Sequence, residues 1–414
     1  MERRWLNHRY FPTLARPQSY RVTKVSGPRA STPHTARGGK REFAVKTIQP
    51  STAHAAPNRR DFVAGTVAIG SLAALPGCAR GDTDRYAAAA ARIRAPLGID
   101  PGPRDFVRYA TLAPNGHNTQ PWRFVEEGSR VTIYPDFGRR TPVVDPDDHH
   151  LFVSLGCAAE NLSIAAGAHG RPTAIAFDPR GGGRIAVDLT TGASSDGDLC
   201  RAIPRRQSTR SLFDGREVAV DDLRQLERAA TIAGVSLILI LARPRLETIL
   251  EQVIAGNNRQ LDDPAFVSEL RHWVRFNPQD ALQQADGLYS ACTGNRTVPT
   301  WLGRRAFSLF FTKKTEDERY AAQLRSSSGV AVFVGDKADP DHWVRVGRSF
   351  QRFALQATAL GLRQALINQP IEVPSVRGPF ARWLGIGDVR PDLVVRFGAA
   401  PAMPMSIRRT PVSV

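Results

Sequence analysis

Residues 111–124 read TLAPNGHNTQPWRF, a polar turn between an apolar, helix-like run and a strand-like run. Pro121 disfavours the helical region for Gln120, and Gly116 permits backbone conformations that a Cβ would obstruct. We therefore expect the turn to present side-chain amides and bare N–H groups, an arrangement suited to a flat ligand with polar edges. The alternative is an ordinary surface turn whose Asn and Gln side chains satisfy neighbouring backbone groups.

Length and composition describe a globular chain with a basic N-terminus. Its 414 residues are 42% apolar and 23% charged, enough for two core-bearing units. The formal net charge is +17, but residues 1–60, with thirteen Lys or Arg against two Glu, contribute +11 of it. The remainder is ordinary for its size, so no nucleic-acid partner is expected. The chain contains no run of 18 or more apolar residues, so no ordinary spanning helix is expected.

The first 78 residues have the composition of an extension and an export signal. Residues 1–58 are rich in Arg, Pro, Ser and Thr without apolar periodicity, which predicts a disordered extension or a mis-assigned start. Residues 59–78 hold two arginines, a short apolar run and a Leu-Pro-Gly-Cys ending, and they resemble a twin-arginine signal with a lipoprotein box. A short buried helix is the alternative. The resemblance implies lipidation of Cys78 and a periplasmic or membrane-anchored protein, cytoplasmic if the signal is not used.

Apolar periodicity predicts the order of elements downstream of the signal. Helices are expected at 82–94, 103–112, 149–169, 218–230 and 342–362, and strands at 131–134, 173–178, 184–189, 235–241, 328–334 and 391–397. The 149–169 helix should be largely buried, and the VSLILIL run at 235–241 should be a buried strand. Residues 244–328 hold helical pieces separated by prolines, and we interpret them as a lid-like insertion.

The cysteines and histidines do not form a recognisable metal motif. Cys157 lies in an apolar helical pattern and is interpreted as a core residue, while a bridge between Cys200 and Cys292 is left open by the sequence. The segment 145–150, DPDDHH, is more typical of a capped helix start than of a ligand set, so no metal site is predicted. No dinucleotide-binding or P-loop glycine motif occurs.

Two segments of the chain resemble each other. Residues 151–177 and 343–369 share an apolar opening, a Gly, Leu and Ala at helical spacing, and a closing Gly. This self-similarity suggests a duplicated unit. We predict a first repeat at 82–200 and a second at 201–414, which would pack like the two subunits of a homodimer.

The opening turn closely resembles the S-x-x-N-x-Q-P-W signature of the FMN-dependent nitroreductase family. RQSTR at 206–210 resembles the basic segment that in the family holds the FMN phosphate and the pyrimidine edge of the ring. PIE at 370–372 resembles the segment whose backbone approaches the flavin N5, and Arg408-Arg409 resembles the C-terminal basic pair at the phosphate. In the family the basic segment precedes the turn within one subunit, whereas here each lies in a different repeat. This arrangement resembles the fused Acg-type subfamily, in which one chain imitates the dimer.

The resemblance implies an α+β nitroreductase-like fold, internally duplicated and monomeric, with an antiparallel or mixed sheet flanked by helices. It implies one FMN per chain, bound by Pro114, Asn115, Gly116, Asn118, Gln120, Arg206, Gln207, Ser208, Arg210, Pro370, Ile371, Glu372, Arg408 and Arg409. His117 would face the substrate, and either Asn257 or Asn258 would replace the asparagine that the family places beyond its turn.

The function implied is two-electron reduction of nitro-aromatic or quinone-like acceptors, with NAD(P)H or another reductant and no catalytic acid or base from the protein. The alternative is a non-catalytic flavin-binding or sequestering protein with a lid over the flavin.

Overall fold

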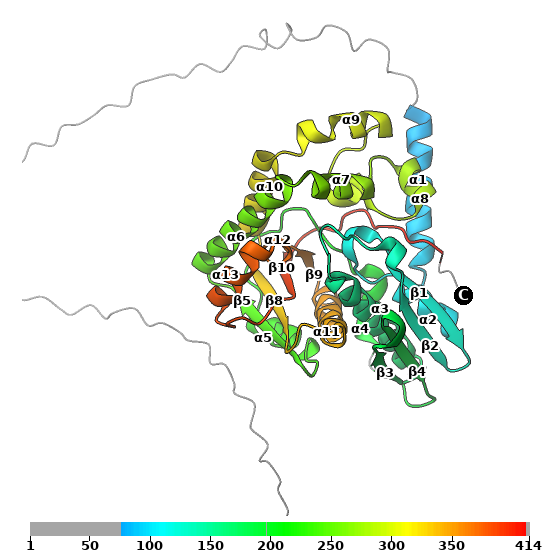
Figure 1. The fold of residues 1–414 in the computed structure, drawn as a ribbon. Coiled ribbons are helices and arrows are strands. Elements are labelled where there is room, and N and C mark those ends of the chain that lie inside the picture. The colour runs from blue at the N-terminus through cyan, green and yellow to red at the C-terminus, as the bar shows by residue number, and fades with distance from the viewer. Residues whose placement is uncertain (1–75, 196, 411–414) are drawn as a thin grey trace, which may run out of the picture. The chain divides into compact units, whose positions relative to one another are not determined.

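The computed structural model describes residues 76–195 and 197–410, coloured in Figure 1. The predictions for residues 1–58 and for the arginine pair at 59–60 lie outside these residues. Cys78 lies within the first described helix, α1 (Pro76–Ile93).

The strands form two four-stranded sheets in which all neighbouring strands are antiparallel (Figure 1). The first sheet has the order β1 (Trp122–Glu127), β2 (Arg130–Pro135), β4 (Arg184–Leu189), β3 (Thr173–Asp178). The second has the order β5 (Val235–Ile240), β8 (Gly329–Gly335), β10 (Leu393–Ala399), β9 (Leu362–Leu366). A short parallel pair, β6 (Val274–Arg275) and β7 (Leu288–Tyr289), lies outside both sheets. The predicted α+β class is confirmed.

The two sheets have the same topology, which confirms the predicted internal duplication. In the first half, α2 (Pro103–Ala110) precedes β1 and β2, and α3 (His149–Ala168) separates them from β3 and β4. In the second half, α5 (Val220–Ala229) precedes β5 and β8, and α11 (Pro340–Ala359) separates them from β9 and β10. Each half therefore places its third strand at the edge of its sheet, beyond the fourth.

Helices α3 and α11 cross at two glycines in equivalent positions of the repeat. A Cβ on Gly156 would lie 2.1 Å from the carbonyl oxygen of Val344, and one on Gly347 would lie 2.0 Å from that of Val153. Each glycine thus meets the residue three positions before the other, as in a two-fold symmetric subunit contact. The halves pack as the two subunits of a homodimer would, and α3 is buried as predicted. It is also the one described helix long and apolar enough to span a membrane, and 89% of its apolar window lies inside the protein.

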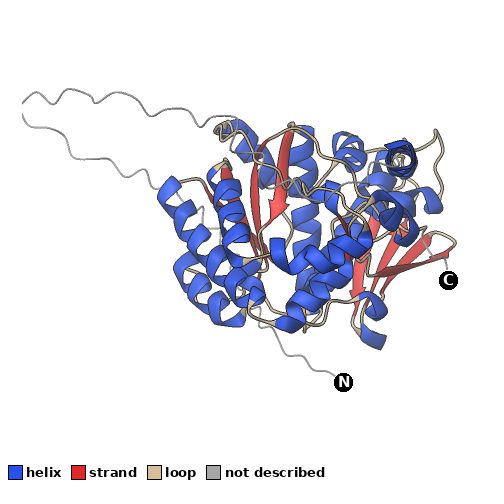
Figure 2. Ribbon diagram, turned by 90° about the horizontal axis from the view of Figure 1, so that it is seen from above, coloured by secondary structure: helices blue, strands red, loops and turns tan. Residues whose placement is uncertain are grey.

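The predicted insertion at 244–328 has two parts: two helices that belong to the hydrophobic core, and a segment between them that lies over the cavity. α6 (Arg243–Leu261) and α10 (Lys313–Arg325) supply Leu246, Ile249 and Leu324 to a hydrophobic cluster shared with β8 and β10. Residues 264–311, named the cover segment here, contain α7 (Pro264–Trp273), α8 (Pro278–Gln284) and α9 (Thr300–Phe310). The second view shows helices packed around both sheets (Figure 2). The remaining helices are α4 (Asp198–Ala202), α12 (Gln369–Glu372) and α13 (Pro374–Leu384).

Three local predictions were wrong or left open. The run at 235–241 forms an edge strand in which only Ile240 is buried, because an apolar run does not show whether a strand has one neighbour or two. The helix expected at 342–362 ends at Ala359, and Gly361, with φ of 78°, leads into strand β9. Cys157, Cys200 and Cys292 are buried free thiols, so the possible bridge is not formed.

Candidate active site

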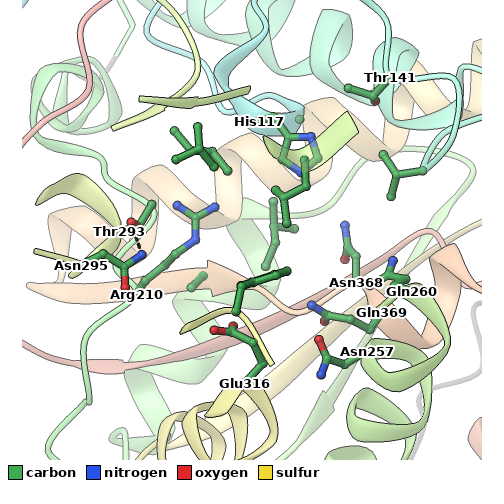
Figure 3. A pocket seen from close by; sticks show the side chains of 18 of the residues that line it. His117, Thr141, Arg210, Asn257, Gln260, Thr293, Asn295, Glu316, Asn368 and Gln369 are labelled. Atoms are coloured by element: carbon green, nitrogen blue, oxygen red, sulfur yellow. Dashed lines mark hydrogen bonds between the residues drawn. The ribbon is translucent and has the colours of Figure 1, made fainter. Parts of the chain in front are cut away.

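A cavity of about 830 Å³ lies between the two halves (Figure 3). The first half lines it with the turn residues Pro114 to His117 and with α3, and the second half with Arg210, β9, α12 and the helices between β5 and β8. Six of the sequence-predicted site residues line this cavity: Pro114, Asn115, Gly116, His117, Arg210 and Glu372. Cys157, on α3, lines it as well.

The turn that begins the first half's contribution has a strained backbone. His117, Asn118 and Gln120 have φ of 47°, 56° and 56°, in the left-handed region that side chains with a Cβ rarely adopt. Gln120 leaves the helical region as expected before Pro121. The expectation for Gly116 was wrong, because its φ is not positive and a Cβ there would meet nothing within 4 Å. Three such residues in one turn persist only where surrounding contacts hold them.

Those contacts come from Asn118 and Gln120, whose amides do not line the cavity. Asn118 Nδ2 donates to the carbonyl oxygens of Gly287 and Ile407, at 3.1 and 3.4 Å. Gln120 Nε2 donates to Ala285 O at 2.9 Å, and its Oε1 accepts from the backbone N–H of Arg409 at 2.8 Å. Both amides are therefore anchors of the turn, contrary to the prediction that they face a ligand, although Asn118 Oδ1 is buried without a hydrogen-bond partner. They fasten the turn to the cover segment and to the C-terminal segment.

Arg210 and His117 bring charge and a polar ring to the cavity wall from opposite halves (Figure 3). Burial lowers the pKa of Arg210, and no side-chain partner to its guanidinium is present in the described part of the chain. Burial, with Arg210 and His150 as further causes, lowers the pKa of His117 to about 4, so its ring is neutral near pH 7. Its Nδ1 is buried without a partner. The pair offers one cation and one unsatisfied ring nitrogen to a ligand.

Four amides gather on the side of the cavity opposite Arg210: Asn257, Gln260, Asn368 and Gln369 (Figure 3). The sequence had left Asn257 and Asn258 as alternatives, and Asn257 is the one that lines the cavity. Gln369 Oε1 is buried without a partner. The other three amides were missed because Gln260 lies in no motif, and Asn368 and Gln369 directly precede the segment at 370–372 without being part of it. Donors and acceptors of this kind match the polar edge of a heterocycle.

The PIE segment divides between core and cavity. Pro370 and Ile371 are buried in α12, and Ile371 belongs to the second hydrophobic cluster. Glu372 lines the cavity, accepts from Gln260 Nε2 at 2.7 Å and lies 3.5 Å from His150 Nε2. Burial raises the pKa of Glu372, and it lowers that of His150 to about 3. A buried carboxyl and a neutral imidazole therefore adjoin the amide side.

Three arginines, the buried Arg206 and the half-buried Arg408 and Arg94, lie near the end of α2 among carbonyl oxygens. Arg206 Nη2 donates to Leu112 O at 3.0 Å, Arg408 Nε donates to Thr111 O at 2.7 Å, and Arg94 Nη2 donates to Ser406 O at 2.7 Å. Burial lowers the pKa of Arg206 and Arg94 to about 10 and that of Arg408 to about 9, and neighbouring guanidinium groups lower it further for Arg206 and Arg408.

Within residues 76–195 and 197–410, none of the three forms an ion pair, and Nε and Nη1 of Arg206 have no hydrogen-bond partner. Buried cations without counter-ions are costly and are found where an anion binds. Arg206 lies near enough to Cys157 on the cavity wall for its charge to oppose the burial that raises the pKa of that thiol. The sequence indicated Arg206 and Arg408, whereas Arg94, at the end of an Ala-rich helix, carried no signal.

Three of the remaining predicted residues hold the chain together and do not line the cavity. Gln207 Nε2 donates to Met403 O at 2.6 Å, and its Oε1 accepts from Met403 N at 2.8 Å. Ser208 forms a parallel bridge with Gln364 of β9. Arg409 Nη2 donates to Gln120 O at 2.9 Å. These contacts fix the C-terminal segment, which carries Arg408, beside the turn.

The cover segment supplies an apolar wall. Its lining side chains are Phe266 and Leu270 of α7, Leu302, Ala306 and Phe307 of α9, and Val274, Phe276, Leu288, Val298 and Phe311 around them. A small mixed cluster ties the segment to α1, where Tyr86 packs on Tyr289 with ring centroids 4.5 Å apart. The cavity is thus polar toward the sheets and apolar toward the cover.

The acidic and histidine-rich segment begins α3. Both carboxylate oxygens of Asp145 accept backbone N–H groups of that helix, from His150 and Leu151, each at 3.0 Å. His149 Nε2 lies 2.9 Å from Asp392 Oδ1, away from the cavity lining. Ligand atoms of Asp145, His149 and His150 lie within 4.8 Å of one another. Asp145 nevertheless acts as the helix cap that the sequence predicted.

Two known proteins are similar in sequence to this chain over most of its length. A protein of Mycobacterium tuberculosis named "putative NAD(P)H nitroreductase" is 26% identical over 318 residues, covering 72% of this chain and 85% of that protein. A second protein of that organism, named "putative NAD(P)H nitroreductase acg", is 24% identical and covers 74% and 92%. The sequence of this chain is thus similar to proteins named nitroreductases.

No family model matches the sequence. Among solved structures, the FMN-dependent nitroreductase NfnB of Mycobacterium smegmatis in complex with NADPH aligns with a TM-score of 0.34 and 15% identity, over 49% of this chain and 87% of that one.

Proposed function

We propose that this chain is an FMN-dependent oxidoreductase of the fused Acg type, reducing nitro-aromatic or quinone-like acceptors in two-electron steps. The observation that carries the proposal is Arg206, buried with two unpaired guanidinium nitrogens beside a cavity that both halves line. The relatives named nitroreductases, which cover most of this chain, support the same activity.

The residues present fit FMN. A phosphate dianion requires cationic donors, and the buried Arg206 and the half-buried Arg408 and Arg94 supply three guanidinium groups without carboxylate partners in the described residues. The heterocyclic ring requires alternating donors and acceptors beside apolar surface, which the amide side and the cover segment supply. The predicted stoichiometry is therefore one FMN per chain.

When bound, FMN supplies the two-electron hydride chemistry. Arg210 places a positive charge on the cavity wall, which stabilises a negatively charged ligand there. His117, neutral and with Nδ1 unpaired, can give or take one hydrogen bond. The apolar side chains of the cover segment would exclude water from the cavity when the flavin is bound.

The test begins with FMN titration of the full chain, followed by absorbance and flavin fluorescence. We expect one FMN per chain and a dissociation constant at least about tenfold weaker in Arg206→Leu, because a charged hydrogen-bonded contact is lost. Arg205→Leu is the matched control, since Arg205 is the exposed neighbour and donates only to Arg201 O. A chain that takes up no FMN, or an Arg206→Leu variant that binds it as wild type does, contradicts the proposal.

Turnover is then measured as NADH or NADPH oxidation in the presence of a nitro-aromatic or a quinone. A second candidate function, flavin binding or sequestration without turnover, is favoured by the cover segment over the cavity. An FMN-loaded chain that is reduced by dithionite, but by neither nicotinamide, supports this second function against the first.

We further propose that the chain is exported and anchored only by a lipid on Cys78, as its N-terminal sequence suggests. The mass of the N-terminal peptide of protein from its native host tests this. A lipidated peptide beginning at Cys78 supports export, and an unmodified peptide continuing upstream of it contradicts it.

A further inference from the structure

Helix α9 exposes large apolar side chains to solvent. Trp301 is 59% exposed, Leu309 75% and Leu302 39%, and of the α9 residues whose burial is described only Gly303 is buried. In the chain they continue the cover segment, and α9 lies on the far side of α7 from the two sheets (Figure 1). Single exposed apolar residues are ordinary, but an exposed Trp and an exposed Leu on one face of a helix are typical of a surface that binds a partner, whereas Leu302 also lines the cavity.

Cations accompany these side chains. Trp301, Arg304, Arg305, Ser308 and Leu309 recur at the helical spacing of one face, and all five are exposed. Between Asp286 and Glu316 the chain has no acidic residue and five cations: Arg296, Arg304, Arg305, Lys313 and Lys314. Neither Arg304 nor Arg305 has an ion-pair partner among the described residues. An exposed Trp and Leu between unpaired cations is the composition of an interfacial helix on an anionic surface.

The opposite face of α9 forms part of the cavity wall. Leu302, Ala306 and Phe307 line the cavity, and a Cβ on Gly303 would lie 2.3 Å from the ring of Phe276. The helix therefore packs closely on the cover segment through a glycine. Only the thickness of α9 therefore separates the exposed Trp301 from the apolar side chains that line the cavity.

We propose that the outer face of α9 docks on an anionic lipid bilayer. Trp301 and Leu309 enter the interfacial region, and Arg304 and Arg305 contact the headgroups. Docking brings the apolar side of the cavity next to the hydrocarbon, so that an apolar, membrane-dissolved molecule can reach the cavity past α9. The docking surface rests on α9 alone, independently of the proposed oxidoreductase function.

The test is co-sedimentation of the full, non-lipidated chain with vesicles of phosphatidylglycerol and phosphatidylcholine. We expect binding to anionic vesicles, weaker at high salt, and a partition coefficient about tenfold lower in the double variant Arg304→Glu/Arg305→Glu. The matched control is Arg92→Glu/Arg228→Glu, on exposed residues of α1 and α5, which changes the net charge of the chain by the same amount. Equal loss in both variants overturns the proposal, because the effect would then be one of net charge.

A second measurement keeps the result independent of the N-terminal segment, which could itself bind lipid. Quenching of tryptophan fluorescence by acyl-chain-brominated phosphatidylglycerol is compared between wild type and Trp301→Phe. We expect quenching in wild type that is largely lost in the variant, and equal quenching in both overturns the proposal. A dimer of the wild type in sedimentation velocity that Leu309→Ser dissociates also overturns it, since a second copy of the chain would then cover α9.

Discussion

The two halves share one topology but join their first two strands in different ways. In the first half, β1 and β2 form a hairpin closed by Gly128 and Ser129. In the second, the equivalent strands β5 and β8 pair in the same way, but residues 241–328 connect them. The strands and the central helices keep the duplicated scaffold, whereas the connection has become α6, the cover segment and α10. Divergence between the halves is therefore concentrated where the cavity is closed.

The halves also differ in what they give to the cavity. The first half lines it with residues 114–117 of the strained turn, and the second lines it with Arg210 and carries the buried Arg206. The residues of the second half that follow α5, at the place of the turn, read Ala-Thr-Ile-Ala-Gly and contain no amide. An asymmetric pair of halves on a symmetric scaffold is the simplest description of the molecule. Substitutions in the shared scaffold test this description most strongly.

The largest effect is expected at the crossing of α3 and α11. Gly156→Ala and Gly347→Ala each place a Cβ about 2 Å from a backbone oxygen of the other helix, so the helices must separate. We expect each variant to lower the free energy of unfolding by about 3 kcal/mol, and by similar amounts because the two contacts are equivalent. Urea unfolding and soluble yield measure this.

The matched control is Gly378→Ala in α13, where a Cβ would meet only the side chain of Arg382 at 3.7 Å. There the substitution should be neutral or stabilising. If Gly156→Ala lowered the free energy of unfolding and Gly347→Ala did not, the result would contradict the two-fold packing of the halves.

The scaffold was largely predictable from sequence because it consists of periodic segments. The buried helix at 149–168 and the hairpin at 173–189 follow directly from apolar spacing. The crossing glycines were visible as part of the repeat, although nothing in one chain shows that they touch. Edge position was not predictable, and β5 shows why: its sequence is apolar, while its burial depends on a neighbour that is absent on one side.

The candidate site was only half predictable. The motif residues identified Arg206, Arg210, the turn and Glu372, but they could not separate the side chains that face the cavity from those that hold the backbone. Asn118 and Gln120 belong to the second group because the strained turn needs anchors. Arg94 and three of the four amides gave no signal in the sequence, since they meet the other site residues only in the folded chain.

A smaller effect is expected at the two glutamines that hold the C-terminal segment, one from each half. Gln120 binds Arg409 and Ala285, and Gln207 binds Met403, so each leaves buried backbone groups unpaired when replaced. We expect Gln120→Leu and Gln207→Leu each to lower the free energy of unfolding by about 1–3 kcal/mol. Urea unfolding measures this, with the exposed Gln279→Leu on α8 as the control.

Limited proteolysis sharpens the same comparison. Cleavage within 403–409 should increase in both variants, but only Gln120→Leu should also increase cleavage near Ala285, because Gln120 alone of the two contacts the cover segment. Equal protection of the cover segment in both variants would mean that the turn does not hold it.

The smallest effect is expected in the pH dependence of stability, through His117 of the first half and Arg210 of the second. Burial, then Arg210 and His150, lower the pKa of His117 to about 4, whereas in the unfolded chain it is about 6.5. Between about pH 6.5 and pH 4, His117 therefore binds a proton in the unfolded chain but not in the folded one. The free energy of unfolding falls as the pH falls through this range. In His117→Gln that loss is absent. From pH 7 to pH 5 the stability of the variant relative to wild type should rise by up to about 2 kcal/mol, measured by urea unfolding at each pH.

Since burial is the first cause and Arg210 the second, Arg210→Met should reduce the pH effect at His117 only in part. Complete loss of the effect in that variant would mean that the charge contributed by the second half, and not the buried position of the turn, keeps His117 neutral.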